Sequence, residues 1–297
     1  MFDTLEHFYF TKSNARGCAV RLQESWQAIL KRREYPAPEQ RLLGEMTAAA
    51  AMLSASITFP GSVLLQIMGD GPVRLAMVEV KPDLGLRAVV RLNEDMPVAE
   101  NAGLRDLVNV SGKGRCAITL LQPDPAKRSE SYQGIVDITE ASSVAEAIAA
   151  YMSRLWLAAD ATAAGGLMLQ KVAAEGGHDA PGAEAGEDWI RVQRLAETVT
   201  SRELLELEPR TLLTRLFWQE NPRMAEPREP KFECGCSRER VAGMIRSLGK
   251  DDAEKLLKEK GAIEVTCEFC GKTYRFDSID VHQLFEQRAA AGTGTIN

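Results

Sequence analysis

The feature that most constrains this chain is a group of four cysteines near its C-terminal end. Cys234-Gly235-Cys236 and Cys267-Glu268-Phe269-Cys270 form two close thiol pairs, separated by 30 residues. Two such pairs from distant segments can converge on one tetrahedral S₄ site, which suits Zn²⁺. A small module of this kind rarely buries enough apolar surface to fold alone, so we expect the metal to supply much of its stability.

The sequence around the cysteines predicts regular elements that would bring the two pairs together. Ser237 and Asp251 are expected to cap two helices, Gly261 to end the second, and Gly271 to allow the turn after the last cysteine. His282 lies in a terminal helix and is not expected to be a ligand, because four thiolates complete a tetrahedron. The predicted elements are helices over 237–248, 251–260 and 278–288 and strands over 263–266 and 273–276.

Length and charge limit what the rest of the chain can be. At roughly 100–200 residues per domain, 297 residues predict two domains or one with an appendage. The net charge of −6 argues against a protein that wraps nucleic acid or lies on an anionic membrane. No run approaches the ~20 apolar residues that cross a bilayer, and the start, MFDTLEHFYF, lacks the pattern of a secretory signal. We therefore expect a cytoplasmic protein with neither nucleic acid nor membrane as partner.

In a reducing compartment, a cysteine cluster indicates metal binding or redox chemistry rather than a permanent disulfide framework. The remaining cysteines, Cys18 and Cys116, stand alone and are interpreted as small buried apolar residues. The chain has three histidines and no visible serine–histidine–aspartate set, which argues against ordinary acid–base catalysis by histidine and leaves carboxylate chemistry open. We expect no enzyme. The turns 69–72 and 112–115 lack the strand–helix context of a phosphate-binding loop.

The first ~175 residues mix helix and strand signals without a steady βαβ alternation, which favours an α+β domain with a mixed sheet-and-helix core. Small residues at Ala48–Ala51 should let the second helix pack closely. The predicted helices cover 22–31, 38–55 and 142–152, and the predicted strands cover 62–68, 73–80, 86–92, 115–121, 132–138, 155–157 and 166–170.

A charged, helix-prone segment follows this core. Residues 176–187 read GGHDAPGAEAGE and predict a loop or linker, since they have small and acidic residues and no apolar period. Helices are predicted over 188–199, 201–207 and 211–218, and Pro222, Pro227 and Pro230 then require an extended chain. Residues 177–233 contain 8 Lys+Arg and 12 Asp+Glu, and such a segment could order or melt depending on what it packs against.

The sequence thus predicts a core domain over 1–176, an acidic helical linker over 177–233 and a small Cys₄ zinc domain over 234–297. Three uses of the thiols remain open on spacing alone. They could form a static zinc ribbon that serves as an adaptor or nucleic-acid-binding module, although the C-x-C spacing and the balanced charge of 234–297 argue against it. They could act as a redox switch in which oxidation removes the zinc ligands. A thiol oxidoreductase is the third possibility, but no thioredoxin-like βαβ setting is visible.

The residues around the two cysteine pairs form a distinctive signature. It consists of Phe232-Glu233-Cys234-Gly235-Cys236-Ser237-Arg238-Glu239-Arg240, followed by Cys267-Glu268-Phe269-Cys270-Gly271 and Tyr274-Arg275-Phe276. This signature closely resembles that of the 33 kDa heat-shock chaperone family. Further motifs in the same order extend the likeness along nearly the whole chain: Gly69-Asp70-Gly71-Pro72, Tyr132-Gln133-Gly134, Ala164-Gly165-Gly166-Leu167-Met168-Leu169-Gln170 and Arg202-Glu203-Leu204-Leu205. This chain departs from the family's pattern at one place. The family has a short polar stretch there, whereas here Ser153 is followed directly by Arg154.

The resemblance implies a cytosolic, ATP-independent holdase of the stress response. It implies that Cys234, Cys236, Cys267 and Cys270 bind one Zn²⁺ per chain in an inactive reduced form whose linker packs on the core. Oxidation would then form the disulfides Cys234–Cys236 and Cys267–Cys270, release zinc and unfold the linker and zinc domain. Homodimers of the oxidised form would hold unfolded or partly folded client proteins. The resemblance gives no role to Cys18 or Cys116.

Overall fold

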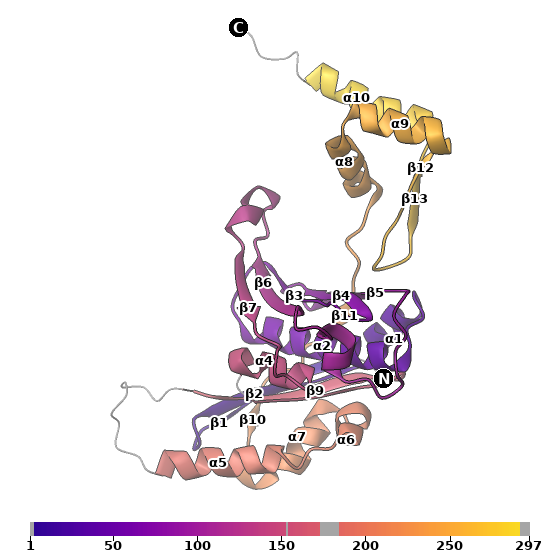
Figure 1. Ribbon diagram of the computed structural model, residues 1–297. Coiled ribbons are helices and arrows are strands. Elements are labelled where there is room, and N and C mark those ends of the chain that lie inside the picture. The colour runs from indigo at the N-terminus through magenta and orange to yellow at the C-terminus, as the bar shows by residue number, and fades with distance from the viewer. Residues whose placement is uncertain (1–2, 153, 173–183, 292–297) are drawn as a thin grey trace. The chain divides into compact units, whose positions relative to one another are not determined.

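The computed structural model describes residues 3–152, 154–172 and 184–291, and it divides the chain into two compact units, Met1–Glu233 and Cys234–Asn297. The larger unit contains two β-sheets and several helices (Figure 1). The smaller unit has a two-stranded sheet and three helices among its described residues. This architecture confirms the α+β class predicted from the sequence.

One sheet of the larger unit joins the first strands of the chain to strands much later in the sequence. Its members are β1 (Thr4–Phe10), β2 (Ala15–Leu22), β8 (Arg154–Ala159), β9 (Ala164–Lys171) and β10 (Arg223–Met224). They lie in the order β10-β1-β2-β9-β8, and all neighbours are antiparallel. Because side chains alternate along a strand, Leu5 packs on one side of the sheet and Phe8 and Phe10 on the other.

The second sheet has six strands and again includes a late segment at its edge. Its members are β3 (Ser62–Met68), β4 (Val73–Val80), β5 (Gly85–Leu92), β6 (Arg115–Leu121), β7 (Tyr132–Val136) and β11 (Lys231–Phe232). They lie in the order β11-β5-β4-β3-β6-β7, with β11 parallel to β5 and the other neighbours antiparallel.

A long helix packs between these sheets and carries the main core. The helices here are α1 (Glu24–Leu30), α2 (Ala37–Ser56), α3 (Leu104–Val108) and α4 (Val144–Met152), with a 3₁₀ turn η1 (Pro125–Glu130). Helix α2 contacts strands β2, β8 and β9 of one sheet and β3, β4 and β5 of the other. Ala48–Ala51 are fully buried, which confirms the expected close packing of this helix.

The linker covers the other face of the five-stranded sheet with three helices. They are α5 (Glu184–Ala196), α6 (Ser201–Glu206) and α7 (Pro209–Phe217), followed by a 3₁₀ turn η2 (Trp218–Glu220). The prediction of a loop over 176–187 was wrong for residues 184–187, because these residues form the first turn of α5. Residues 176–183 lie outside the described part of the chain. The apolar stripe of these helices packs on Phe8, Phe10 and the strand β9.

Polar contacts and short strands tie the rest of the linker to both sheets. Arg21 donates from Nε to the Leu205 carbonyl at 2.6 Å, and Arg210 donates from Nε to Glu6 at 2.7 Å. After the helices, the proline-containing segment is extended as predicted, and Arg228 exchanges backbone hydrogen bonds of 2.8 Å with Leu5. This segment forms β10 beside β1 and β11 beside β5.

The smaller unit contains α8 (Arg238–Leu248), α9 (Lys250–Lys260), β12 (Ile263–Thr266), β13 (Thr273–Phe276) and α10 (Ser278–Ala291). The two strands fall at the predicted positions. The Ser237 cap is confirmed, because its Oγ accepts a 3.3 Å hydrogen bond from the Arg240 amide. The Asp251 cap was wrong: α9 begins after Gly249, at φ 95°, and Asp251 lies in the first turn, where its charge suits the helix dipole. Gly261 ends α9 at φ 74°, as expected.

Some elements were not anticipated. Neither β1 nor β2 was predicted, and the helix predicted over 22–31 begins too early, because Leu22 is the last residue of β2. The carboxylate of Asp3 accepts from the amides of Gln23 and Glu24 and so supplies the start of α1 from a distant position. Ser153, where the sequence departs from the family pattern, lies outside the described residues.

Replacing Phe217 by alanine tests the packing of the linker. Its side chain is fully buried, with ring centroids 5.6 Å from Phe8 and 5.2 Å from Phe10. We expect Phe217→Ala to lower the free energy of unfolding of the full chain by about 3–5 kcal/mol, since a buried aromatic side chain leaves a cavity. Urea denaturation measures this. The neighbouring Trp218→Ala is the control, because Trp218 is 68% exposed; equal losses in both variants would contradict the assignment.

Candidate metal centre

Two short segments of the smaller unit hold the four cysteines. Cys234 and Cys236 lie between β11 and α8, while Cys267 and Cys270 lie in the turn between β12 and β13. In that turn Cys267 donates its amide to the Lys272 carbonyl at 2.9 Å and accepts from the Gly271 amide at 2.8 Å. Gly271 has φ 70°, a conformation that favours glycine and lets the chain reverse directly after the last cysteine.

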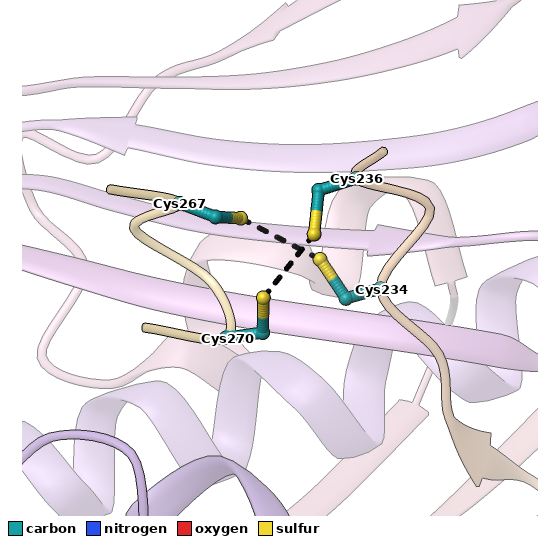
Figure 2. Close-up of side chains that lie close together, drawn as sticks. All are labelled: Cys234, Cys236, Cys267 and Cys270. Carbon is teal, nitrogen blue, oxygen red and sulfur yellow. Dashed lines mark hydrogen bonds between the residues drawn. The ribbon is translucent and has the colours of Figure 1, made fainter. Parts of the chain in front are cut away.

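The four sulfur atoms converge on one point. All lie within 4.8 Å of one another, and Figure 2 shows the side chains pointing inward from the two segments. The closest contacts join the two pairs: Cys234 Sγ lies 3.6 Å from Cys267 Sγ, and Cys236 Sγ lies 3.3 Å from Cys270 Sγ. A zinc ion with Zn–S bonds near 2.3 Å spaces its sulfurs about 3.8 Å apart, so this arrangement has about the right size for a tetrahedral S₄ site.

Two side chains outside the cysteine set fix the geometry of the site. Tyr274 on β13 is buried and donates its hydroxyl to Cys236 Sγ at 3.2 Å. Arg240 on α8 donates from Nη1 to the Gly235 carbonyl at 2.6 Å, which holds the turn between the first two cysteines. No role was predicted for Tyr274, although it lies on a predicted strand close to the second cysteine pair.

The surroundings shift the pKa of three of these thiols. Burial would raise the pKa of Cys236, but hydrogen bonds from Tyr274 and the neighbouring thiols outweigh it and lower the pKa to about 7. Burial raises the pKa of Cys234, and burial with the neighbouring sulfurs raises that of Cys270 to about 12. A soft divalent cation at the centre of the four sulfurs would favour their thiolate forms.

The other candidate residues lie apart from this cluster. His282 is an exposed residue of α10, and the group of ligand atoms found among the described residues does not include it. Cys18 and Cys116 are fully buried in the larger unit, and burial raises the pKa of each thiol to about 12. The two glycine-rich turns support each other, because Asp70 Oδ2 accepts hydrogen bonds from the Ser111 and Lys113 amides.

The chain matches one known protein family over most of its length. A sequence model described as "Hsp33 protein" matches residues 3–277. The chain belongs to the Hsp33 family. It is 39% identical to the 33 kDa chaperonin of Nitrosococcus oceani, over 97% of this chain and 96% of that one. It is also 39% identical to the 33 kDa chaperonin of Azotobacter vinelandii, over 99% and 97% of the two chains.

A solved structure supports the fold. The crystal structure of the 33 kDa chaperonin (heat shock protein 33 homolog) from Thermotoga maritima matches with a TM-score of 0.76 and 20% identity, over 97% of this chain and 99% of that one. The matched relatives are named chaperonins, and membership in the Hsp33 family supports a chaperone role for this chain. None of the helices in the described part of the chain has both the length and the apolar character needed to span a membrane.

Thiol labelling tests the division of the cysteines into two classes. In reduced protein at pH 8, after a chelator has removed any metal, we expect iodoacetamide to modify Cys234, Cys236, Cys267 and Cys270 at least ~100-fold faster than the two thiols that lie buried in the larger unit. Peptide mass spectrometry identifies each site. The same reaction in denaturant is the control and should modify all six; rapid labelling of Cys18 or Cys116 without denaturant would contradict the assignment.

Proposed function

We propose that this Hsp33 family member is a redox-regulated, ATP-independent holdase of the cytoplasm, controlled by a zinc site at Cys234, Cys236, Cys267 and Cys270. The observation that carries the proposal is the convergence of these four sulfurs within 4.8 Å, in a chain whose relatives are named chaperonins. The chain is organised as a core domain over 1–176, a linker over 177–233 and a zinc domain over 234–297.

The reduced form would bind one Zn²⁺ per chain. Four thiolates close the tetrahedron and leave no open position, so the metal supplies structural stability rather than a catalytic water. The smaller unit needs it, because its apolar cluster has only eight buried members among the described residues: Val241, Ala242, Ile245, Ala253, Ile263, Tyr274, Phe276 and Val281. In small zinc peptides the metal contributes on the order of 10–16 kcal/mol, about the full stability of a domain.

Oxidation would remove the ligands pair by pair. A peroxide oxidises one thiolate to a sulfenic acid and is itself reduced to water; the second thiol attacks that sulfur, and a second water leaves as the disulfide forms. The proposed disulfides are Cys234–Cys236 and Cys267–Cys270. The closest sulfurs in the structure belong to different pairs. Within a pair, however, the chain keeps the sulfurs together after the two segments separate, because the closed loop is short.

Loss of the metal would unfold residues 234–297 and then release the linker. The helices α5–α7 cover an apolar face that includes Phe8, Phe10, Leu167 and Leu169, and this face is what unfolding clients would contact. Oxidised chains would associate as homodimers while they hold clients. No step in this cycle consumes ATP or makes a chemical product from the client.

Zinc release measured beside client aggregation tests the proposal. We expect peroxide with mild heat to release one Zn²⁺ per chain, followed with a zinc indicator, and to suppress light scattering by an unfolding client without ATP. A double variant, C18A/C116A, should respond as the wild type does, because these thiols are buried. The proposal fails if oxidised, zinc-free protein holds clients no better than reduced protein. Salt-sensitive binding of nucleic acid by the reduced form would instead favour a static zinc-ribbon module.

The hydroxyl of Tyr274 provides a second test of the zinc site. Tyr274→Phe removes the 3.2 Å hydrogen bond to Cys236 Sγ and leaves the ring in place. We expect zinc affinity to fall about 10-fold, since partners of ligand atoms orient them and tune their basicity. Competition with a chelator of known affinity measures this. Tyr132→Phe, at a tyrosine that is 62% exposed on β7, is the matched control; equal affinity in the Tyr274 variant and the wild type would show that the hydroxyl plays no part.

A further inference from the structure

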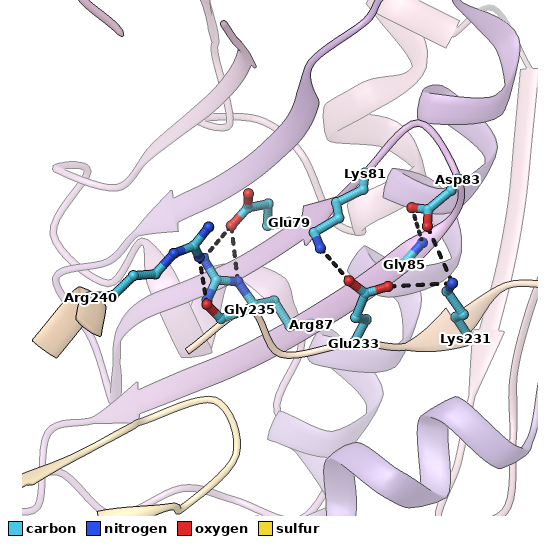
Figure 3. Close-up of polar contacts among 9 residues, drawn as sticks. All are labelled: Glu79, Lys81, Asp83, Gly85, Arg87, Lys231, Glu233, Gly235 and Arg240. Carbon is cyan, nitrogen blue, oxygen red and sulfur yellow. Dashed lines mark hydrogen bonds and ion pairs between the residues drawn. The ribbon is translucent and has the colours of Figure 1, made fainter. Parts of the chain in front are cut away.

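Four charges of alternating sign join the end of the linker to the turn between β4 and β5. Lys81 and Asp83 lie in that turn, Lys231 lies on β11, and Glu233 follows β11 directly. Glu233 forms ion pairs with Lys81 and, at 3.4 Å, with Lys231, whose Nζ also lies 3.2 Å from Asp83. Figure 3 shows the Glu233 carboxylate between the two ammonium groups. We call these four residues the ion-pair network.

The backbone beside the ion-pair network is paired in register. The amide of Lys231 donates to the Leu84 carbonyl at 3.1 Å, and the amide of Glu233 donates to the Leu86 carbonyl at 2.8 Å. Gly85 lies opposite Lys231, and a Cβ there would come within 2.7 Å of Glu233 Oε2. The glycine therefore leaves room for the Glu233 side chain, and backbone and charges together specify one alignment of β11 on β5.

Phe232 adds an apolar contact at the same place. Its half-buried ring packs against the main core cluster, and the guanidinium carbon of Arg32 lies 4.0 Å from the ring centroid. The last residues of the linker are thus held by three kinds of interaction: a two-residue parallel strand, the ion-pair network and this aromatic contact.

The position of the ion-pair network in the chain gives it a particular role. Glu233 is bonded to Cys234, so unfolding that spreads from the cysteines toward the N-terminus meets this network first. Arg228 beside Leu5, the strand β10 and the helix α7 come later along that path. The side chains of Lys81 and Glu233 are each 36% exposed, so their attraction is modest and screened by salt.

We propose that the ion-pair network is the barrier that unfolding of residues 234–297 must cross before it spreads into the linker. The helices α6 and α7 stay on the sheet while the network is closed and are released once it opens. This inference rests on the proposed function, because it concerns how loss of the zinc site leads to linker release. It assigns the regulation to residues of the core and linker rather than to the thiols themselves.

Charge reversal in the full-length protein tests the inference. Lys81→Glu and Glu233→Lys each place like charges together, whereas the double variant K81E/E233K restores that pair with inverted signs. Glu206→Lys is the matched control, because Glu206 pairs with Arg202 within α6 and is 58% exposed. Each protein is studied reduced and zinc-loaded, and again after a chelator has removed the metal under reducing conditions. Zinc content is measured for every variant.

Hydrogen exchange of two segments gives the readout. In zinc-loaded protein we expect residues 225–233 to exchange about 3- to 10-fold faster in K81E and E233K than in wild type, the size expected for lost ion pairs near the surface. In metal-free protein, residues 200–218 should follow the same order. The double variant should return part of the way to wild type, because the lysine introduced at position 233 still faces Lys231. The control E206K should exchange as wild type does. Gly85→Ala keeps all four charges but displaces Glu233, so it should behave as the single reversals do.

The inference is overturned if the single variants and Gly85→Ala exchange as wild type does in 225–233. It is equally overturned if they open 225–233 without hastening exchange of 200–218 in metal-free protein. Neither result depends on chaperone activity, because the metal is removed by a chelator. A wild-type protein that fails to hold clients after oxidation would refute the proposed function and leave the exchange comparison valid.

Discussion

Phe217 of the linker is buried against Phe8 and Phe10 of the first strand, and around these three rings the helices α5–α7 cover one face of the five-stranded sheet. The rest of the arrangement depends on this contact. A sheet that packs α2 on one face needs a cover for the other, since Leu167 and Leu169 of β9 are fully buried there. The cover is the linker, which contains 12 acidic and 8 basic residues and forms short helices. Short helices of this composition are not stable by themselves, so the linker depends on its contact with that face to remain folded.

The two units are stabilised in different ways. The larger one buries a continuous core on both sides of α2, where alanines allow close approach of helix and sheets. The smaller one has few buried side chains, and its most concentrated interaction is the group of four sulfurs. Under the proposed function, a chemical change at those sulfurs would therefore affect the folding of the smaller unit strongly and leave the main core of the larger unit in place.

Much of this could be predicted from the sequence, and the successes share a local cause. The strands β3, β4 and β13 alternate more and less buried side chains, and β5 and β6 are continuous buried runs next to turn residues. Ser237 and Gly261 act within a few residues of their own positions. The four cysteines could be grouped because their spacing is characteristic. The failures involve partners far apart in the chain: β2 pairs with β9, and Asp3 starts α1 across twenty residues. The ion-pair network was missed for the same reason, since Lys81 and Glu233 become neighbours only once β11 lies on β5.

The two shortest strands have a consequence that reaches beyond the linker itself. β10 lies at one edge of the five-stranded sheet, outside β1, and β11 lies at one edge of the six-stranded sheet, outside β5. Departure of the linker would therefore expose more than apolar side chains. The backbone amides and carbonyls of β1 and β5 that now pair with it would become open sheet edges, which can accept an added strand of almost any sequence. A protein that must hold many different unfolded chains would gain from such edges a means of recognition that depends on the main chain, which every client has in common.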